Sequence, residues 1–209
     1  MKDKEQLVEL FKLKAEAVSA VVTPVTSLHQ AFEYVVDICE KKEACQLLAS
    51  GCEEGLSDPA QALCETKQDK VIAAPGLTKK LFKELETAGK GKGFKFIQDG
   101  LRNHLGGIDI GFTVVDYGLA ETGTLVLASK SEETRLATMV CEIHVAVLPL
   151  SKLKATSSDL EDFLLASFTA TPDYTAFITG ASRTADIERV LALGVHGPLE
   201  LHILLWEDK

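Results

Sequence analysis

Hydrophobic residues near the start of the chain recur at the three- and four-residue spacing of amphipathic helices. The first predicted helix has an apolar face formed by Leu7, Leu10, Phe11 and Val18. Pro24 breaks this pattern, because proline cannot donate the hydrogen bond that continues a helix. A second helix is predicted to start at Ser27, since Gln30 stands three residues later as in a capping box. Its apolar stripe comprises Leu28, Ala31, Phe32, Val35, Val36 and Cys39. We expect both faces to pack in the core or against a partner.

Short apolar runs then alternate with helical patterns along the rest of the chain. The predicted strands span residues 46–49, 71–74, 94–97, 144–148, 175–178 and 201–206. The predicted helices start near Asp58 and span about 79–87, 133–139, 158–167 and 184–193. Ser158 and Glu161 form a second capping box, and Gly194 ends the last helix. This alternation predicts an α/β fold with a mainly parallel sheet and helices on both faces.

The middle of the chain departs from this alternation. Residues 112–117 and 124–128 are both strand-like and are separated by a short glycine-containing segment. A crossover helix cannot fit between them, so we expect an antiparallel pair or one bent pair of strands.

Length and charge narrow the class of protein. A chain of 209 residues fits one domain over residues 1–209, and we expect residues 1–43 to form an N-terminal helical segment packed on it. The formal net charge of −9 argues against a nucleic-acid-binding protein, which needs a basic surface, and against attraction to anionic membranes. A local basic pocket for one small anion remains compatible with this charge.

The N-terminal residues and the cysteines bear on compartment and cofactors. The chain starts Met1-Lys2-Asp3-Lys4 without the apolar segment of a signal peptide, and no run is long enough for a membrane helix. We therefore expect a soluble cytoplasmic protein. Of five cysteines, none are spaced C-x-x-C, so we expect reduced structural thiols and neither a metal site nor an iron–sulfur cluster in this chain.

Glu121 is the first candidate for chemistry. It is the one acid in the segment from Gly118 to Thr124 and is followed by Thr122, Gly123 and Thr124. Its carboxylate could act as nucleophile, general base or ligand partner, with the glycine allowing close approach of a substrate. The alternative is a tight turn whose acid accepts backbone N–H bonds.

A second candidate is the segment from Gly180 to Asp186, where a strand runs into a predicted helix. Free N–H groups at a helix start near Ser182 or Thr184 would attract an anion, and Arg183 adds a fork suited to carboxylate or phosphate. The alternative is an ordinary N-cap whose acids, including Asp186, offset the helix dipole. The segment lacks the glycine motifs typical of mononucleotide and dinucleotide sites.

A third candidate is His196, which lies between Gly194 and Gly197 in a loop. It could act as an acid, a base or a donor to a ligand, or could bond the backbone of a turn. His144 opens a strand and points toward the same region or bonds a neighbour in the sheet. Arg135 is predicted to be a salt-bridge partner on a helix surface. We expect all three candidate loops to lie at the carboxyl ends of the strands, where open α/β sheets bind ligands.

These loops resemble the lactate-utilization protein C family, also called the LUD-domain family. The resemblance rests on two long segments, residues 117–127 and 178–188, and on the closing segments 194–198 and 201–205. Arg135 and His144 resemble further landmarks of the family. The resemblance is specific from about Asp109 onward and general before it.

The resemblance implies a fold similar to ribose-phosphate isomerases and CoA transferases. It also implies a role in oxidising lactate to pyruvate beside two iron–sulfur partner proteins. We therefore expect a non-redox accessory component with no cofactor of its own. The alternative is an enzyme or sensor for a small carboxylate or phosphate ligand, of acyl, CoA or sugar-phosphate type, with Glu121 as base or nucleophile. A third reading is a structural scaffold whose signature loops are turns.

Overall fold

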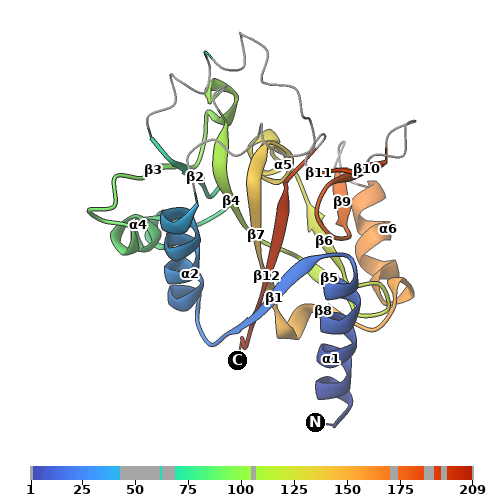
Figure 1. The fold of residues 1–209 in the computed structure, drawn as a ribbon. Coiled ribbons are helices and arrows are strands. Elements are labelled where there is room, and N and C mark those ends of the chain that lie inside the picture. The colour runs from blue at the N-terminus through green and yellow to red at the C-terminus, as the bar shows by residue number, and fades with distance from the viewer. Residues whose placement is uncertain are drawn as a thin grey trace.

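A six-stranded parallel sheet forms the centre of the computed structural model, which describes residues 2–42, 62, 69–104, 107–169, 174–185, 191–193 and 197–208 (Figure 1). Its strands lie in the order β1-β12-β7-β4-β2-β3. Their bounds are Ala20–Val25 (β1), Val71–Ala73 (β2), Lys95–Ile97 (β3), Ile108–Val114 (β4), Cys141–Pro149 (β7) and Glu200–Trp206 (β12). The predicted α/β fold with a mainly parallel sheet is therefore confirmed.

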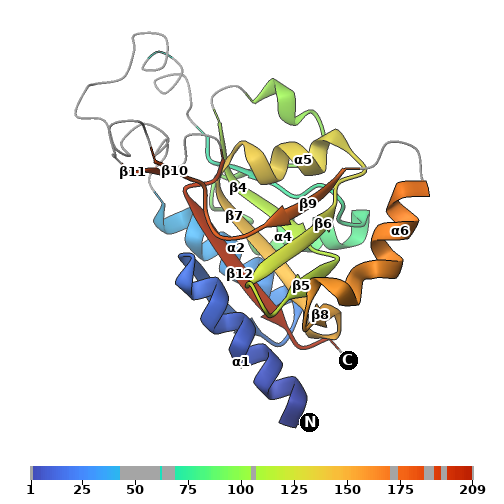
Figure 2. The same cartoon turned by 90° about the vertical axis from the view of Figure 1, so that its right-hand side faces the viewer.

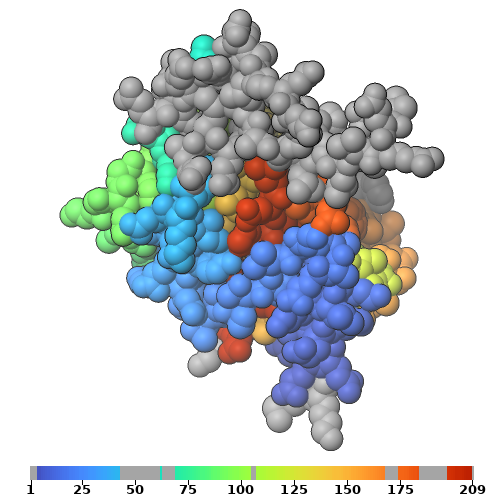
Figure 3. Space-filling model, in the orientation of Figure 1, coloured from blue at the N-terminus to red at the C-terminus, as the bar shows by residue number. Residues whose placement is uncertain are grey.

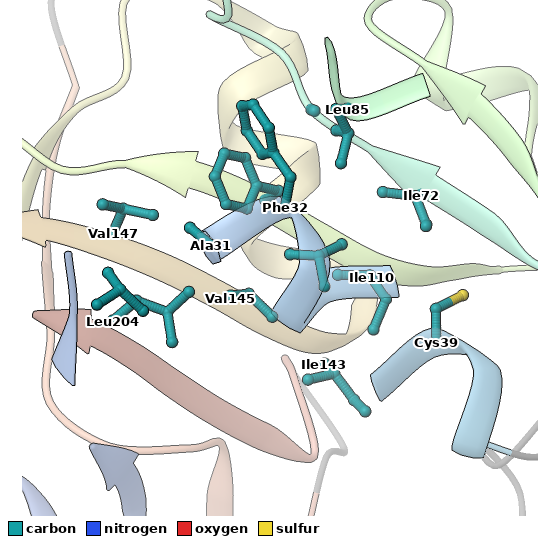
Figure 4. Close-up of a cluster of buried hydrophobic side chains, with 14 residues drawn as sticks. Ala31, Phe32, Cys39, Ile72, Leu85, Ile110, Ile143, Val145, Val147 and Leu204 are labelled. Carbon is teal, nitrogen blue, oxygen red and sulfur yellow. The ribbon is translucent and has the colours of Figure 1, made fainter. Parts of the chain in front are cut away.

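Two helices cover one face of this sheet, α2 (Leu28–Lys41) and α4 (Lys79–Ala88). Phe32 of α2 is fully buried in this core (Figure 4). Its ring meets that of Phe112 of β4 edge to face, with the ring centroids 5.6 Å apart. The core on this side continues with Leu85 of α4 and with the apolar side chains of five strands. The apolar stripe predicted for the second helix is thus the main contact of α2 with the sheet.

The other face carries α1 (Lys2–Ala17), α5 (Glu132–Met139) and a second, four-stranded sheet in the order β8-β5-β6-β9 (Figure 2). Its strands are Tyr117–Leu119 (β5), Thr124–Ala128 (β6), Leu153–Lys154 (β8) and Thr175–Ile178 (β9). Helix α6 (Glu161–Thr169) packs on the outside of this sheet, against β5 and β6. The described connections include 3-10 turns at Leu101–Asn103, Leu150–Lys152 and Ser157–Leu160.

The N-terminal segment contributes a strand as well as helices. Helix α1 ends at Ala17, Ser19 takes a left-handed conformation with φ 63°, and β1 begins at Ala20. Pro24 lies inside β1, where it is tolerated because β1 is an edge strand of the sheet. The predicted start of α2 is confirmed, since the Ser27 side chain accepts the Gln30 N–H. The Gln30 side chain returns to the N–H of Thr26 at 2.8 Å instead of to Ser27.

The single strand predicted over residues 112–117 is wrong, because the chain divides at Asp116. Residues up to Val114 belong to β4 in the parallel sheet, whereas β5 belongs to the second sheet and pairs antiparallel with β6. The Asp116 carboxylate accepts the Ala128 N–H at 2.7 Å, and the Asp116 N–H donates to the Val126 carbonyl at 3.0 Å. Asp116 therefore fixes the point at which the chain leaves one sheet for the other.

Two predictions near the C-terminal half are also corrected. The second capping box is formed by Thr156 and Asp159, two residues before the predicted pair, and opens a 3-10 turn that leads into α6. The helix predicted over residues 184–193 is wrong, since Arg183–Ala185 (β10) and Leu191–Leu193 (β11) form an antiparallel pair. The strand predicted at 46–49 and the helix start at Asp58 lie outside the described residues.

Candidate functional site

Two of the candidate loops meet at the turn between α1 and β1. Gly123 lies so close to α1 that a Cβ atom there would stand 2.3 Å from the backbone nitrogen of Ala15. A Cβ atom on Gly180 would stand 2.4 Å from the carbonyl oxygen of Val18. The Arg183 guanidinium donates to the hydroxyl of Ser19 in the same turn. The glycines and the arginine of the two segments therefore hold this turn in place.

Threonine hydroxyls connect the same two segments. Thr124 Oγ1 donates to Thr122 Oγ1 at 2.7 Å and lies 2.7 Å from Thr179 Oγ1. Thr124 is almost fully buried, so these hydrogen bonds replace water contacts that its hydroxyl would otherwise need. Thr122 and Thr124, two of the predicted ligand-binding threonines, thus make hydrogen bonds within the protein.

Glu121 occupies the turn between β5 and β6 and is exposed. Its Oε1 accepts the N–H of Ser157 at 2.7 Å, and its own N–H donates to the Ala155 carbonyl at 3.1 Å. This is the turn arrangement that the sequence left open as the alternative to catalysis. The exposed carboxylate can still be reached by a ligand, so a catalytic role for Glu121 stays a prediction.

The Ser182 and Gly197 loops lie at the amino ends of the parallel strands. The Ser182 N–H donates to the Pro198 carbonyl at 2.9 Å, and the Leu199 N–H donates to the carbonyl of Glu142 near the start of β7 at 2.8 Å. Their predicted place at the carboxyl ends is therefore wrong. Among the residues that the structure describes, no helix begins beside Ser182, and Thr184 lies in β10. Asp186 and His196 lie outside the described residues.

Arg135 and His144 make internal hydrogen bonds. The Arg135 guanidinium donates to the Ser129 carbonyl at 2.8 Å and so fixes the connection from β6 to α5, which replaces the predicted surface salt bridge. His144 is buried in β7, and its Nε2 lies 2.8 Å from the Thr113 hydroxyl. Burial lowers the pKa of His144 to about 4, so its imidazole is neutral near pH 7.

This shift predicts an acid-sensitive fold. An unfolded histidine binds a proton below about pH 6.5, whereas folded His144 does so only near pH 4, so stability is lost as pH falls between these values. The expected loss across the window is roughly 3 kcal/mol. Urea unfolding at several pH values should show this loss of unfolding free energy. In the His144→Gln variant, the unfolding free energy should depend less steeply on pH between about 6.5 and 4. An equal slope in wild type and variant would contradict this assignment.

The carboxyl ends of β2 and β4 form the topological switch point of the parallel sheet. From β2 the chain runs through α4 to β3 at the outer edge, whereas from β4 it runs through the second sheet and α5 to β7. The connection from β2 therefore runs toward the β3 edge over the face covered by α4, whereas the connection from β4 runs toward β7 over the opposite face. In open α/β sheets, the crevice at such a point is the usual ligand site.

A cavity of about 170 Å³ lies at this point. It is lined by Pro75, Gly76, Leu77, Thr113, Val114, Asp116, Leu127, Ala128 and Thr134. None of the loops predicted from the sequence includes it, although Pro75-Gly76 directly after one predicted strand and Asp116 within another are signals in the sequence. Recognising it required knowing that the two segments end side by side.

A larger groove of about 670 Å³ opens beside α1 and the carboxyl end of β12. Its lining residues are Lys4, Glu5, Val8, Glu9, Thr26, Leu150, Glu207 and Asp208. The four acids exceed the one lysine, so this groove disfavours anions.

The structure also contains two polar clusters, one of them fully buried, that the sequence pattern does not indicate. Lys42 contacts the carboxylates of Asp109 and Glu142, and all three side chains are at least 98% buried. On the α2 face, the Tyr34 hydroxyl lies 2.9 Å from Nδ1 of His202, whose Nε2 lies 2.8 Å from the Glu200 carboxylate.

Within the described part of the chain, no three histidine, cysteine or acidic residues are placed to hold a metal ion. None of the described helices is long and apolar enough to cross a membrane.

Curated relatives match about half of this chain. A lactate utilization protein C of Halalkalibacterium halodurans is 38% identical over 104 residues, which are 48% of this chain and 45% of that protein. A Bacillus subtilis protein of the same name is 32% identical over 104 residues, 48% of this chain and 43% of that protein. An uncharacterized protein of Neisseria meningitidis is 37% identical over 97 residues, 46% of this chain and 42% of that protein. The chain thus covers less than half the length of these relatives.

A solved structure and a family model extend the comparison to nearly the whole chain. The crystal structure of a DUF162 family protein from Deinococcus radiodurans matches 97% of this chain and 98% of its own, with TM-score 0.56 and 16% identity. That likeness concerns the fold alone. The family model of the LUD domain matches residues 8–206. The chain therefore belongs to the LUD domain family.

Proposed function

We propose that this chain is a cytoplasmic, non-redox component of a lactate-utilization system whose iron–sulfur clusters are carried by partner proteins. Membership of the LUD family and the relatives named lactate utilization protein C support the lactate-utilization role. The chain covers less than half the length of those relatives, so we infer its activity and partners by extension from them.

The observation that carries the non-redox accessory role is the internal use of the signature residues. Gly123 packs on the end of α1, and Gly180 packs on Val18 in the turn that follows it. Arg183 bonds Ser19 in that turn, and Glu121 bonds the backbone of Ser157. Residues engaged in this way support a scaffold that presents a surface to partners. The five cysteines support it further, because their spacing matches no common cluster motif.

A gene deletion tests the lactate-utilization role. Cells of the source organism that lack this gene should grow poorly on L-lactate as sole carbon source and normally on glucose, and the intact gene should restore growth. A tagged chain purified from lactate-grown cells should bring down proteins that contain iron and acid-labile sulfide. Normal growth of the deletion strain on lactate would contradict the proposal.

A second candidate function is that of a small-anion enzyme or sensor. It is favoured by the exposure of Arg183 and Glu121, which leaves both charged groups within reach of a ligand. Arg183→Ala should then abolish a thermal shift caused by phosphate or a CoA ester, whereas Arg102→Ala, another exposed arginine, should not. Retained binding in the Arg183 variant would remove this candidate. Acyl transfer further requires a covalent adduct on Glu121 that mass spectrometry would detect.

A further inference from the structure

Strand β9 forms an open edge of the second sheet (Figure 2). The Ser129 N–H donates to the Tyr174 carbonyl, so the residues at 174, 176 and 178 turn their backbone groups toward β6. Thr175 and Phe177 alternate with them and therefore direct their N–H and carbonyl groups away from the sheet. Within the described part of the chain, β6 is the one strand that pairs with β9. A further strand could therefore add to this edge.

The other edge strands of the two larger sheets are protected against such addition. In β1 the Val25 carbonyl accepts the Glu207 N–H on the inner side, so Pro24 stands on the outer side, where it lacks the N–H that a new strand would need. Strand β3 is three residues long and begins with the exposed Lys95, and β8 is two residues long and ends with Lys154. Short strands and lysines discourage pairing at an edge. Strand β9 contains neither proline nor a charged residue.

Phe177 supplies an apolar anchor at the open edge. It stands opposite Val126 of β6, on the face of the second sheet that α6 covers. Val126 is fully buried against Phe163 and Leu164 of α6, whereas Phe177 is 49% exposed. Helix α6 thus covers β6 but leaves half of an aromatic side chain of β9 in water. Aromatic side chains contribute much of the binding energy of protein contacts when they become buried.

A second β9 strand fits this edge in one antiparallel register. With Phe177 opposite its counterpart, Thr175 of each strand stands opposite Thr179 of the other, and Ala176 stands opposite Ile178. Aromatic–aromatic and threonine–threonine pairs both stabilise neighbouring strands. Charge also favours this contact, because two copies with a net charge of −9 repel each other and β9 brings no acid into the contact. The self-complementary order of residues favours a second copy over an unrelated strand.

We propose that two copies of this chain associate through β9, so that their second sheets join into one continuous sheet across a twofold axis at Phe177. Both copies then present α6 on the same side of the joined sheet, because the axis stands perpendicular to it. The two Phe177 rings pair between these helices and lose their contact with water. This association uses no residue of the candidate loops and does not depend on the proposed function.

Sedimentation of the full chain at several concentrations tests the association, and the wild type should show a concentration-dependent dimer. Thr175→Pro removes an N–H that only a second strand would use, and Phe177→Lys sets like charges opposite each other. Each change occurs twice across the axis, so each should weaken dimerisation at least about tenfold. Val21→Lys is the matched control, since Val21 is a 45% exposed apolar residue of the β1 edge, and should dimerise like the wild type.

Two results would overturn the proposal. One is a wild-type chain that stays monomeric at roughly millimolar concentration. The other is a dimer that both β9 variants leave unchanged, with circular dichroism showing that the variants are folded. Such a dimer would use a different surface.

Cysteine variants test the register of the pair. Residues in a hydrogen-bonded antiparallel pair have Cα atoms about 5.5 Å apart, which is within the range of a disulfide. Phe177→Cys should therefore give a cross-linked dimer on mild oxidation, whereas Ala176→Cys, opposite Ile178 of the other copy, should not. The wild type oxidised in parallel accounts for the five native cysteines. Equal cross-linking at both positions would reject the register, and a Phe177→Cys chain that cross-links only to a different protein would assign the edge to that protein and reject self-association.

Discussion

Replacing Gly123 by alanine is expected to destabilise the protein by about 3 kcal/mol. Its φ of 68° costs an alanine roughly 1 kcal/mol, and the new Cβ would meet the backbone of Ala15 at 2.3 Å and of Lys14 at 2.6 Å. Because these atoms belong to a helix, α1 must move as a body to relieve the contact. Overpacking of this kind typically costs a further 1–3 kcal/mol. Urea unfolding monitored by circular dichroism measures the sum.

Gly93→Ala is the matched control for this prediction. Its φ of 73° is nearly the same, but nothing lies within 4 Å of the position that a Cβ would take. It should therefore pay only the backbone cost of roughly 1 kcal/mol. Similar losses in both variants would mean that the contact between Gly123 and α1 contributes nothing to stability.

Replacing Lys42 by methionine should have the largest effect of any charge substitution that we consider, a loss of about 3–5 kcal/mol. The Lys42 ammonium lies 2.9 Å from Asp109 Oδ1 and also contacts Glu142, and both carboxylates are fully buried. Methionine matches the length of the lysine stem but removes the ammonium that contacts both carboxylates in a region that water does not reach. The free energy of unfolding, measured by urea denaturation, reports the change.

The neighbouring Lys41 provides a matched control. It makes the same type of contact, with Asp37 at 2.7 Å, but both side chains are more than half exposed. Such surface pairs contribute about 0.3–0.5 kcal/mol, so Lys41→Met should be nearly silent. If Lys42→Met were equally silent, the buried cluster would not be held by ionic contacts.

Much of the fold could be predicted from local patterns. The helix α2 has an apolar stripe and a side-chain cap within its own sequence, and both operate in the structure. Residues 184–193 carry an equally plausible helical pattern, but there the Ser182 N–H bonds Pro198 and the flanking residues pair as strands. A helix preference of a few tenths of a kcal/mol per residue is too small to outweigh this strand pairing and the contact with Pro198.

The candidate site was harder to predict than the fold. The sequence predicts ligand-binding roles for Gly123, Gly180 and Arg183, and these roles stay predictions. In the structure Gly123 packs on the end of α1, whereas Gly180 and Arg183 contact Val18 and Ser19 in the turn that follows it. The direction of each strand decides which loops lie at the same end of the sheet. The residues of the loops do not reveal that direction. For the same reason the cavity escaped notice, since Gly76 and Asp116 come together only when β2 and β4 lie side by side.

The pairing of β1 with β12 has a consequence for how the chain folds. Ala20 pairs with Leu201, so two neighbouring strands are joined across about 180 residues, and β12 lies between β1 and the remainder of the sheet. During synthesis, α1 and β1 emerge well before β12 and have no strand to join until residues 200–206 have left the ribosome. Contacts between residues so far apart in the sequence form slowly. Until they form, the exposed apolar side chains of Leu13 and Val21 in the segment from α1 to β1 can promote aggregation. The nascent chain should therefore need chaperones mainly in the interval before β12 is synthesised.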